Sequence, residues 1–209
     1  MVERGVRSPS GHGSATVLGG ERGRASSAVC HAGAHKRPRE KQAKTDPACI
    51  TMINGISKLA HDKLIKRGKT IAIAESCSGG QLASELIRYP GASRFFILGV
   101  VAYNNSSKVE ILGVPRKLIS EYGAVSKQVA ESMARNIRKK VKADLGLSIT
   151  GLAGPAGATT HKPVGLVFIC LDAENKNICR EFHFRGSRQD IRKKATQKAL
   201  RLLCAHLSP

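Results

Sequence analysis

Aromatic residues, long apolar runs and acidic residues are all scarce in this 209-residue sequence. It has no Trp, three Tyr and five Phe, so it offers few of the aromatic rings on which single-stranded bases stack. No run approaches the roughly 18 uncharged apolar residues of a membrane-spanning helix, and the first residues lack the apolar segment of a secretory signal. We therefore expect no membrane partner, and nucleic acid is a poor fit as a ligand.

Cysteine occurs six times, but without the spacing of a metal site or of a disulfide framework. The six positions are scattered, and no two of them form a C-x-x-C pair. Neither a zinc knuckle nor a set of structural disulfides is therefore indicated. We predict reduced thiols and a cytoplasmic location.

Basic residues outnumber acidic ones by 35 to 15, which gives a formal net charge of +20. The first 46 residues hold 9 basic and 4 acidic residues, so most of the excess lies in the remainder of the chain. Such a charge favours an anionic partner: a nucleic acid, an acidic surface or a phosphorylated small molecule. A lysine-rich composition without a functional role is the alternative.

The chain divides into a basic tail and one domain. Residues 1–48 are rich in Gly, Ser, Arg and Ala and have no apolar period, so we predict a disordered tail there. Its composition is typical of an organelle transit peptide, or else of a gene start placed too far upstream. Residues 52–207 form the predicted domain.

Helical and extended patterns alternate along that domain. Helices are expected at residues 53–66, 81–88, 105–112 and 127–141, and after a capping box at Ser187 and Asp190. Strands are expected at residues 70–74, 95–103, 145–150, 164–171 and 178–184, of which 95–103 is apolar throughout, like a strand buried on both faces. The order predicts an α/β fold: a single three-layer domain, with a mixed sheet and helices on both faces.

Three polar segments follow predicted strands, where ligands bind in α/β sheets. They are residues 75–80, 103–108 and 150–155. In the first, Ser76 precedes a turn whose glycines open a helix, so the turn can supply a nucleophile and also backbone N–H groups, near Ser78, Gly79 and Gly80, for an oxyanion. It is neither a G-x-S-x-G elbow nor a Walker A loop, and a simple strand–helix turn is the alternative.

A serine nucleophile needs a base. Of the seven histidines only His161, in a loop, is placed to serve. A buried lysine is the other option, because burial lowers its pKa until it accepts a proton, and Lys108 is the best placed; the alternative is an ordinary surface lysine. Cys77 is a rival nucleophile, since a helix N-terminus lowers a thiol pKa, although a small buried side chain explains it equally well.

Taken together and in order, these motifs resemble the CinA C-terminal domain family, the nicotinamide-nucleotide amidohydrolases. The resemblance covers about residues 52–207. The matching segments are residues 74–80, 90–93, 99–105 with Lys108, 123–126, 143–147, 150–155, 162–165 and 184–188.

The resemblance implies an enzyme that hydrolyses nicotinamide mononucleotide to nicotinic acid mononucleotide and ammonia through a serine–lysine pair. It gives Ser76 as the nucleophile, Lys108 as the base and Tyr103 as a third catalytic residue. It also implies a homo-oligomer, a phosphorylated nucleotide as substrate, and no metal or other cofactor. The substrate-binding residues that it implies are Cys77, Ser78, Gly79, Gly80, Asn104, Thr150, Gly151, Ala153, Gly154 and Arg188.

Two positions depart from the family's pattern. Ala156 and Ser187 each stand where the family usually has an aspartate.

The alternative function is a non-catalytic, CinA-like module that binds a partner in competence or in the response to DNA damage. The basic charge favours such a module weakly, whereas a scaffold has no need of both Ser76 and Lys108.

Overall fold

The structure, a computed structural model, describes residues 47–208. The predicted basic tail lies outside the described residues except for Pro47 and Ala48, which belong to the first helix. This helix begins earlier than predicted because proline is well tolerated at a first helical position, where a missing N–H costs no hydrogen bond.

Helices occupy the positions where apolar residues recur every three to four residues, and serine hydroxyls cap two of them. Ser126 accepts from the N–H of Val129, and Ser187 with Asp190 forms the predicted capping box. Among the described helices, none has both the length and the hydropathy that a bilayer-spanning segment requires. The helices are α1 (Pro47–Arg67), α2 (Gln81–Leu86), α3 (Asn105–Glu110), α4 (Arg116–Tyr122), α5 (Lys127–Lys140) and α6 (Arg188–His206), with a 3-10 turn, η1, at Ala92–Arg94.

The strands form one five-stranded mixed sheet in the order β2-β1-β3-β4-β5. β1 pairs in parallel with both β2 and β3, whereas β4 pairs antiparallel with β3 and β5. The carboxyl ends of β1, β2 and β3 therefore meet at one edge, and their starts meet the β4–β5 turn at the other. The strands are β1 (Ile71–Glu75), β2 (Phe96–Val101), β3 (Leu145–Gly151), β4 (Leu166–Ala173) and β5 (Lys176–His183).

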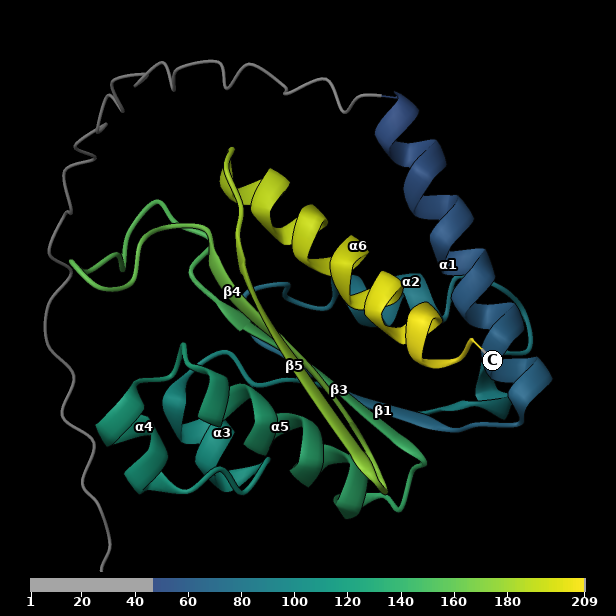
Figure 1. Cartoon of the computed structure of the whole chain (residues 1–209), viewed down its shortest axis with the longest axis horizontal. Helices are drawn as coiled ribbons and strands as arrows, with labels where there is room; N and C mark the ends of the chain where they lie inside the picture. Colours follow the sequence, from purple (N-terminus) through teal and green to yellow (C-terminus); the bar gives the residue numbers. More distant parts are fainter. Residues whose placement is uncertain (1–46, 209) are drawn as a thin grey trace, which may run out of the picture. The chain divides into compact units, whose positions relative to one another are not determined.

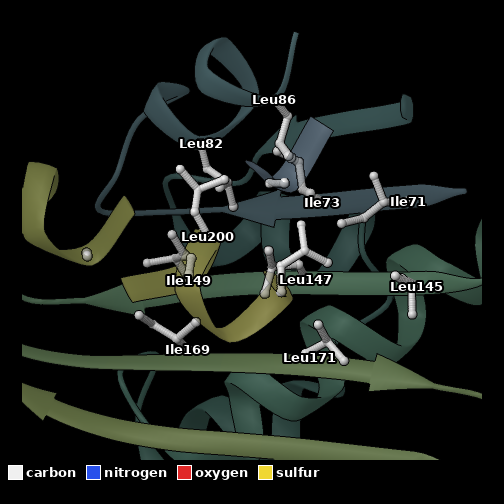
Figure 2. Close-up of a cluster of buried hydrophobic side chains, with 14 of the residues drawn as sticks. Ile71, Ile73, Leu82, Leu86, Leu145, Leu147, Ile149, Ile169, Leu171 and Leu200 are labelled. Atoms are coloured by element: carbon white, nitrogen blue, oxygen red, sulfur yellow. The ribbon is translucent and has the colours of Figure 1, made fainter. Parts of the chain in front are cut away.

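Helices cover both faces of the sheet, as the sequence predicted. α1, α2 and α6 lie on one face and α3, α4 and α5 on the other (Figure 1). On the first face, Leu82 and Leu86 of α2 and Leu200 of α6 pack against Ile73 and Leu147 of the central strands (Figure 2). Buried side chains on both faces of the sheet hold the central strands in place, and with them the loops at the strand ends.

The predicted strand at residues 95–103 is shorter and more exposed than its composition indicated. β2 is an edge strand, and its side chains alternate between half-buried and exposed, with Ile97 46% and Val101 47% exposed. The prediction of burial on both faces was therefore wrong, because an apolar run does not reveal that a strand lies at an edge. Helix α4 was not predicted; it has seven residues, none of them fully buried, and its apolar residues Leu118 and Ile119 are only partly covered.

One pair of cysteines contradicts the expectation of reduced thiols. Cys170 of β4 and Cys179 of β5 lie directly opposite each other in the ladder and form a disulfide. Most of the polar segment between the two strands belongs to the strands themselves, and only Glu174–Asn175 form the turn. This short turn brings the two cysteines into register. Cys77 and Cys204 are free and buried.

Candidate functional site

A pocket of about 210 Å³ lies at the edge where β1, β2 and β3 end. It is lined by residues from all three predicted polar segments and from the start of α6. Of the predicted site residues, the pocket brings together Ser76, Cys77, Tyr103, Lys108, Thr150, Gly151, Ala153, Gly154 and Arg188. Ser78, Gly79, Gly80 and Asn104 do not line it.

The turn that carries Ser76 is held by the carboxylate of the residue before it. Glu75 ends β1 fully buried, and its carboxylate accepts from the backbone N–H groups of Gly80, Leu82 and Ala83 at 3.0, 3.1 and 2.8 Å. A negative charge there stabilises the N-terminus of α2. Sequence reasoning missed this role, although an acidic residue between an apolar strand and a helix start was a usable signal.

Glu75 also changes which N–H groups are available to an oxyanion. The N–H of Gly80 is bonded to Glu75 Oε2, and the N–H of Gly79 is bonded to the Ser76 carbonyl. The prediction that these two donors form an oxyanion hole was therefore wrong. Within the described residues, the N–H groups of Cys77 and Ser78 donate to no carbonyl or carboxylate, and they are the donors that the turn leaves.

A second support for the turn comes from α6. Arg192 donates to the Ser78 carbonyl through Nε at 3.1 Å and through a terminal nitrogen at 2.9 Å. Gly79 has a φ of +62°, which favours glycine, and a Cβ there would lie 3.0 Å from that guanidinium and would displace it slightly. The Ser78 hydroxyl is buried and has no hydrogen-bond partner among the described residues. Ser78 and Gly79 thus shape the turn.

Lys108 is buried within α3, with a relative exposure of 2%. Its Nζ donates to the carbonyls of Ala102, Tyr103 and Asn104 at 3.0, 3.3 and 3.4 Å, and no carboxylate of the described residues pairs with it. Burial is the largest influence and lowers the pKa of Lys108 from its ordinary value. The buried, unpaired lysine that the sequence suggested is therefore present in the pocket wall.

Asn104 caps α3 and does not face the pocket. Its side-chain oxygen accepts from the N–H of Ser107 at 2.7 Å, and its carbonyl is one of the three that receive Lys108. This arrangement aims the lysine side chain back toward the end of β2. The predicted substrate-binding residue is thus one that positions Lys108.

The two rival groups are poorly suited to the chemistry. Burial raises the pKa of Cys77 to about 12, even though Arg188 and Lys108 act in the opposite direction, so its thiolate is rare at neutral pH. His161 lies outside the pocket, in a separate exposed hollow beside Lys162 and His183. Neither a cysteine nor a histidine mechanism is supported by this arrangement.

Arg188 ties two walls of the pocket together. Its guanidinium donates to the Tyr103 hydroxyl at 2.5 Å and to the Gly154 carbonyl at 2.6 Å. Tyr103 is 58% exposed, so this bridge lies at the mouth of the pocket. The arginine therefore sets the spacing between the end of β2 and the loop after β3.

Thr150 has a role in the framework. It is buried at the end of β3, and its hydroxyl donates to the Ala124 carbonyl at 2.9 Å, which fixes the segment before α5 against the pocket.

Two positions depart from the family's pattern. Ala156 lines the pocket but has no polar side-chain group, and Ser187 caps α6. Within the described residues, no cluster of three or more His, Cys, Asp or Glu side chains is placed to hold a metal ion.

The chain is similar to known proteins over this same region. The model of the CinA C-terminal domain family matches residues 53–207. A CinA-like protein of Desulfotalea psychrophila is 46% identical over 152 residues, which is 73% of this chain and 37% of that protein. A CinA-like protein of Prochlorococcus marinus is 46% identical over 147 residues, 69% of this chain and 34% of that protein.

Solved structures agree with these sequence matches. The competence/damage inducible protein of Agrobacterium tumefaciens superposes with a TM-score of 0.72 at 33% identity, covering 74% of this chain and 94% of that one. A competence or damage-inducible protein of Enterobacter asburiae gives 0.72 at 32% identity, covering 75% and 98%. The chain thus spans just over a third of the two curated relatives but nearly all of these solved chains. By sequence and by fold, the chain belongs to the CinA C-terminal domain family.

Proposed function

We propose that this chain is an amidohydrolase that converts nicotinamide mononucleotide to nicotinic acid mononucleotide and ammonia, with Ser76 as nucleophile and Lys108 as base. The observation that carries the proposal is a buried lysine without a carboxylate partner among the described residues, in the same pocket as a strand-end serine. The substrate class comes from the family resemblance. The basic composition of the chain agrees with a phosphorylated substrate.

The acylation step needs Lys108 as a neutral amine. A neutral amine has two N–H groups and one lone pair, so it can keep two of its three carbonyl partners while the lone pair accepts the Ser76 proton. The serine oxygen then attacks the carboxamide carbon, and the carbonyl oxygen becomes an oxyanion. In this proposal the N–H groups of Cys77 and Ser78 receive that charge.

Breakdown of this intermediate returns the proton. Lys108 delivers it to the amide nitrogen, the C–N bond breaks, and ammonia leaves an ester on Ser76. Water then attacks the ester carbon while Lys108 accepts one of its protons. The serine oxygen departs and regains that proton, and the carboxylic acid that forms loses its remaining proton to solvent and is released as the carboxylate.

The pocket encloses only part of such a substrate. Its volume of about 210 Å³ is below the roughly 300–1,000 Å³ of a site that surrounds a whole drug-sized ligand. We therefore assign the carboxamide and its ring to the pocket, and the ribose and phosphate to its mouth, where Arg188 and Tyr103 lie. Two of the five N–H donors of Arg188 are used in the bonds to Gly154 and Tyr103, and in this proposal the others are available to the phosphate.

Ammonia release from nicotinamide mononucleotide by the purified full chain tests the proposal. We expect stoichiometric ammonia and nicotinic acid mononucleotide, and no turnover of free nicotinamide at the same concentration. Wild-type chain that binds the nucleotide but releases no ammonia would contradict an enzymatic role and favour the binding module. Turnover of free nicotinamide at an equal rate would show that the ribose phosphate is not recognised.

A further inference from the structure

A second and larger hollow lies at the opposite edge of the sheet from the candidate pocket. Its volume is about 750 Å³. Its walls are the C-terminal ends of α1, α5 and α6, the start of β3 and the β4–β5 turn. No step of the proposed amidase reaction reaches this edge, so a function of the hollow does not depend on that proposal.

Charge is distributed unevenly around this hollow. Two carboxylates line it, Asp144 and Glu174, against six basic side chains. The six are Arg67, Lys69, Arg138, Lys139, Lys142 and Lys176.

Internal partners already neutralise part of that charge. Asp144 accepts from Lys69 at 2.9 Å and from the N–H and hydroxyl of Thr70 at 2.8 and 2.7 Å, and these partners lower its pKa to about 2. Arg138 donates to Asp172 at 2.6 Å. Both pairs serve the framework.

Four cations remain without a carboxylate partner in the part of the chain that the structure describes. Arg67 donates to the Leu207 carbonyl, and no ion pair between described residues involves Lys139, Lys142 or Lys176. Of the carboxylates lining the hollow, Glu174 on the two-residue turn is the one left to oppose them. These four side chains are exposed, so water weakens their mutual repulsion, and a bound anion would offset what remains of it.

Lys142 adds a second observation. It follows α5 with a φ of +52°, and it is the one non-glycine residue with positive φ in the described chain. Its N–H bonds the Lys139 carbonyl as the last helical turn closes. Glycine is the usual residue in this conformation, so the fold here accepts a strained backbone at a position that places a lysine on the hollow. Such strain is found most often where a side chain has a function.

We infer that this hollow is a binding site for a small, multiply charged anion of the diphosphate or triphosphate class. A triphosphate carries about as much negative charge as the four unpaired cations can neutralise. The concave shape and the volume lie in the range of small-molecule sites, and no Phe, Tyr or Trp of the described residues lines the hollow to stack a base. These features favour a compact anion over a nucleic-acid strand.

Calorimetric titration of the full chain with inorganic triphosphate at about 0.15 M salt tests the inference. We expect saturable binding of one anion per chain, weaker binding of orthophosphate, and loss of affinity as salt rises. Lys142→Gly and Lys176→Gln should each weaken binding by about threefold or more. Glu174→Gln should strengthen it, since it removes the carboxylate that opposes the unpaired cations.

Matched controls separate this site from the candidate pocket and from damage to the fold. Lys140→Gln removes an exposed lysine of α5 outside the hollow and should leave triphosphate binding unchanged. Lys142→Gly should melt no lower than wild type, because glycine suits that backbone. Weaker binding by a variant of full stability is then a loss of contact.

Three results would overturn the inference. The first is absence of saturable triphosphate binding. The second is binding that Arg188→Ala abolishes and Lys142→Gly leaves intact, which would place the anion in the candidate pocket. The third is tighter binding of duplex DNA than of triphosphate, weakened by the same lysine substitutions, which would make this a nucleic-acid surface.

Discussion

Two lysines at opposite edges of the sheet occupy places that lysines usually avoid. Lys108 is buried among three carbonyls, with no carboxylate partner in the described chain, at the edge where the parallel strands end. Lys142 is exposed, but its backbone has a positive φ, at the edge where β3 begins. The first has an abnormal environment for its charge and the second an abnormal backbone. Each destabilises the fold locally, which leads us to assign both a function.

The largest effect that this comparison predicts is at Ser76, the proposed partner of Lys108. Ser76→Ala should lower kcat for ammonia release by about 10³-fold or more, because a nucleophile and its base act as a unit. The melting temperature should stay close to that of wild type, since the change removes one hydroxyl. Steady-state ammonia release and thermal unfolding of the same preparation are the measurements.

Ser78→Ala is the matched control for Ser76→Ala. The Ser78 hydroxyl is buried in the same turn without a partner among the described residues, so its removal should preserve activity and leave stability equal or slightly higher. Equal losses of activity in the two variants would show that the turn is merely fragile. Near wild-type turnover in Ser76→Ala would exclude Ser76 as the nucleophile.

Loss of Arg188 should have an intermediate effect. Arg188→Ala breaks the bridge between Tyr103 and Gly154 and should lower kcat/KM by roughly 10- to 100-fold, because small displacements of positioned groups are costly to catalysis. Arg185→Ala, in the loop just before α6 and outside the pocket, is the control and should retain activity. The bridge has no importance for the reaction if both variants behave like wild type.

The pH dependence of kcat/KM should reflect the lowered pKa of Lys108. Activity needs its neutral form, so kcat/KM should rise with pH through one ionisation below the ordinary lysine range and then level off. Cys77→Ala should show the same limb, because the pKa of Cys77 is about 12. A profile that falls across that range would contradict a lysine base.

The smallest predicted effect is on stability, at the other edge. Lys142→Gly should raise the free energy of unfolding by about 1 kcal/mol, because glycine carries no steric penalty in the left-handed conformation. Chemical denaturation of the two proteins measures it. A decrease would show that the Lys142 side chain makes a stabilising contact and would weaken the parallel between the two lysines.

Much of the architecture could be predicted from the sequence because the spacing of apolar residues indicates which faces are buried. The apolar periods of α5 and α6 and the apolar run of β1 placed helices on both faces of a central sheet. Edge position left no such mark, so the exposure of β2 was missed. The register that joins Cys170 to Cys179 depends on a turn of only two residues, and the polar composition of that segment suggested a longer one.

The candidate site divides along similar lines. Strand ends converge by topology, so Ser76, Tyr103 and Lys108 were expected to meet. Hydrogen bonds to backbone groups have no sequence period, and for this reason the roles of Arg192 and Thr150 could not be foreseen. The role of Glu75 was missed although its position between a strand and a helix start was a usable signal. The same contacts explain why Gly79 and Gly80 were wrongly assigned to an oxyanion hole: their N–H groups had already found partners.

Replacing Lys108 by methionine tests the central claim most directly, when activity and stability are measured on the same variant. The lowered pKa means that the unfolded chain binds a proton more tightly than the folded chain. Lys108 therefore destabilises the fold most below its folded pKa, and this effect disappears as pH rises toward the unfolded value. We predict that Lys108→Met releases almost no ammonia, yet is at least as stable as wild type at neutral pH. An active Lys108→Met, or an inactive one that is several kcal/mol less stable, would contradict a catalytic role and make Lys108 a structural residue.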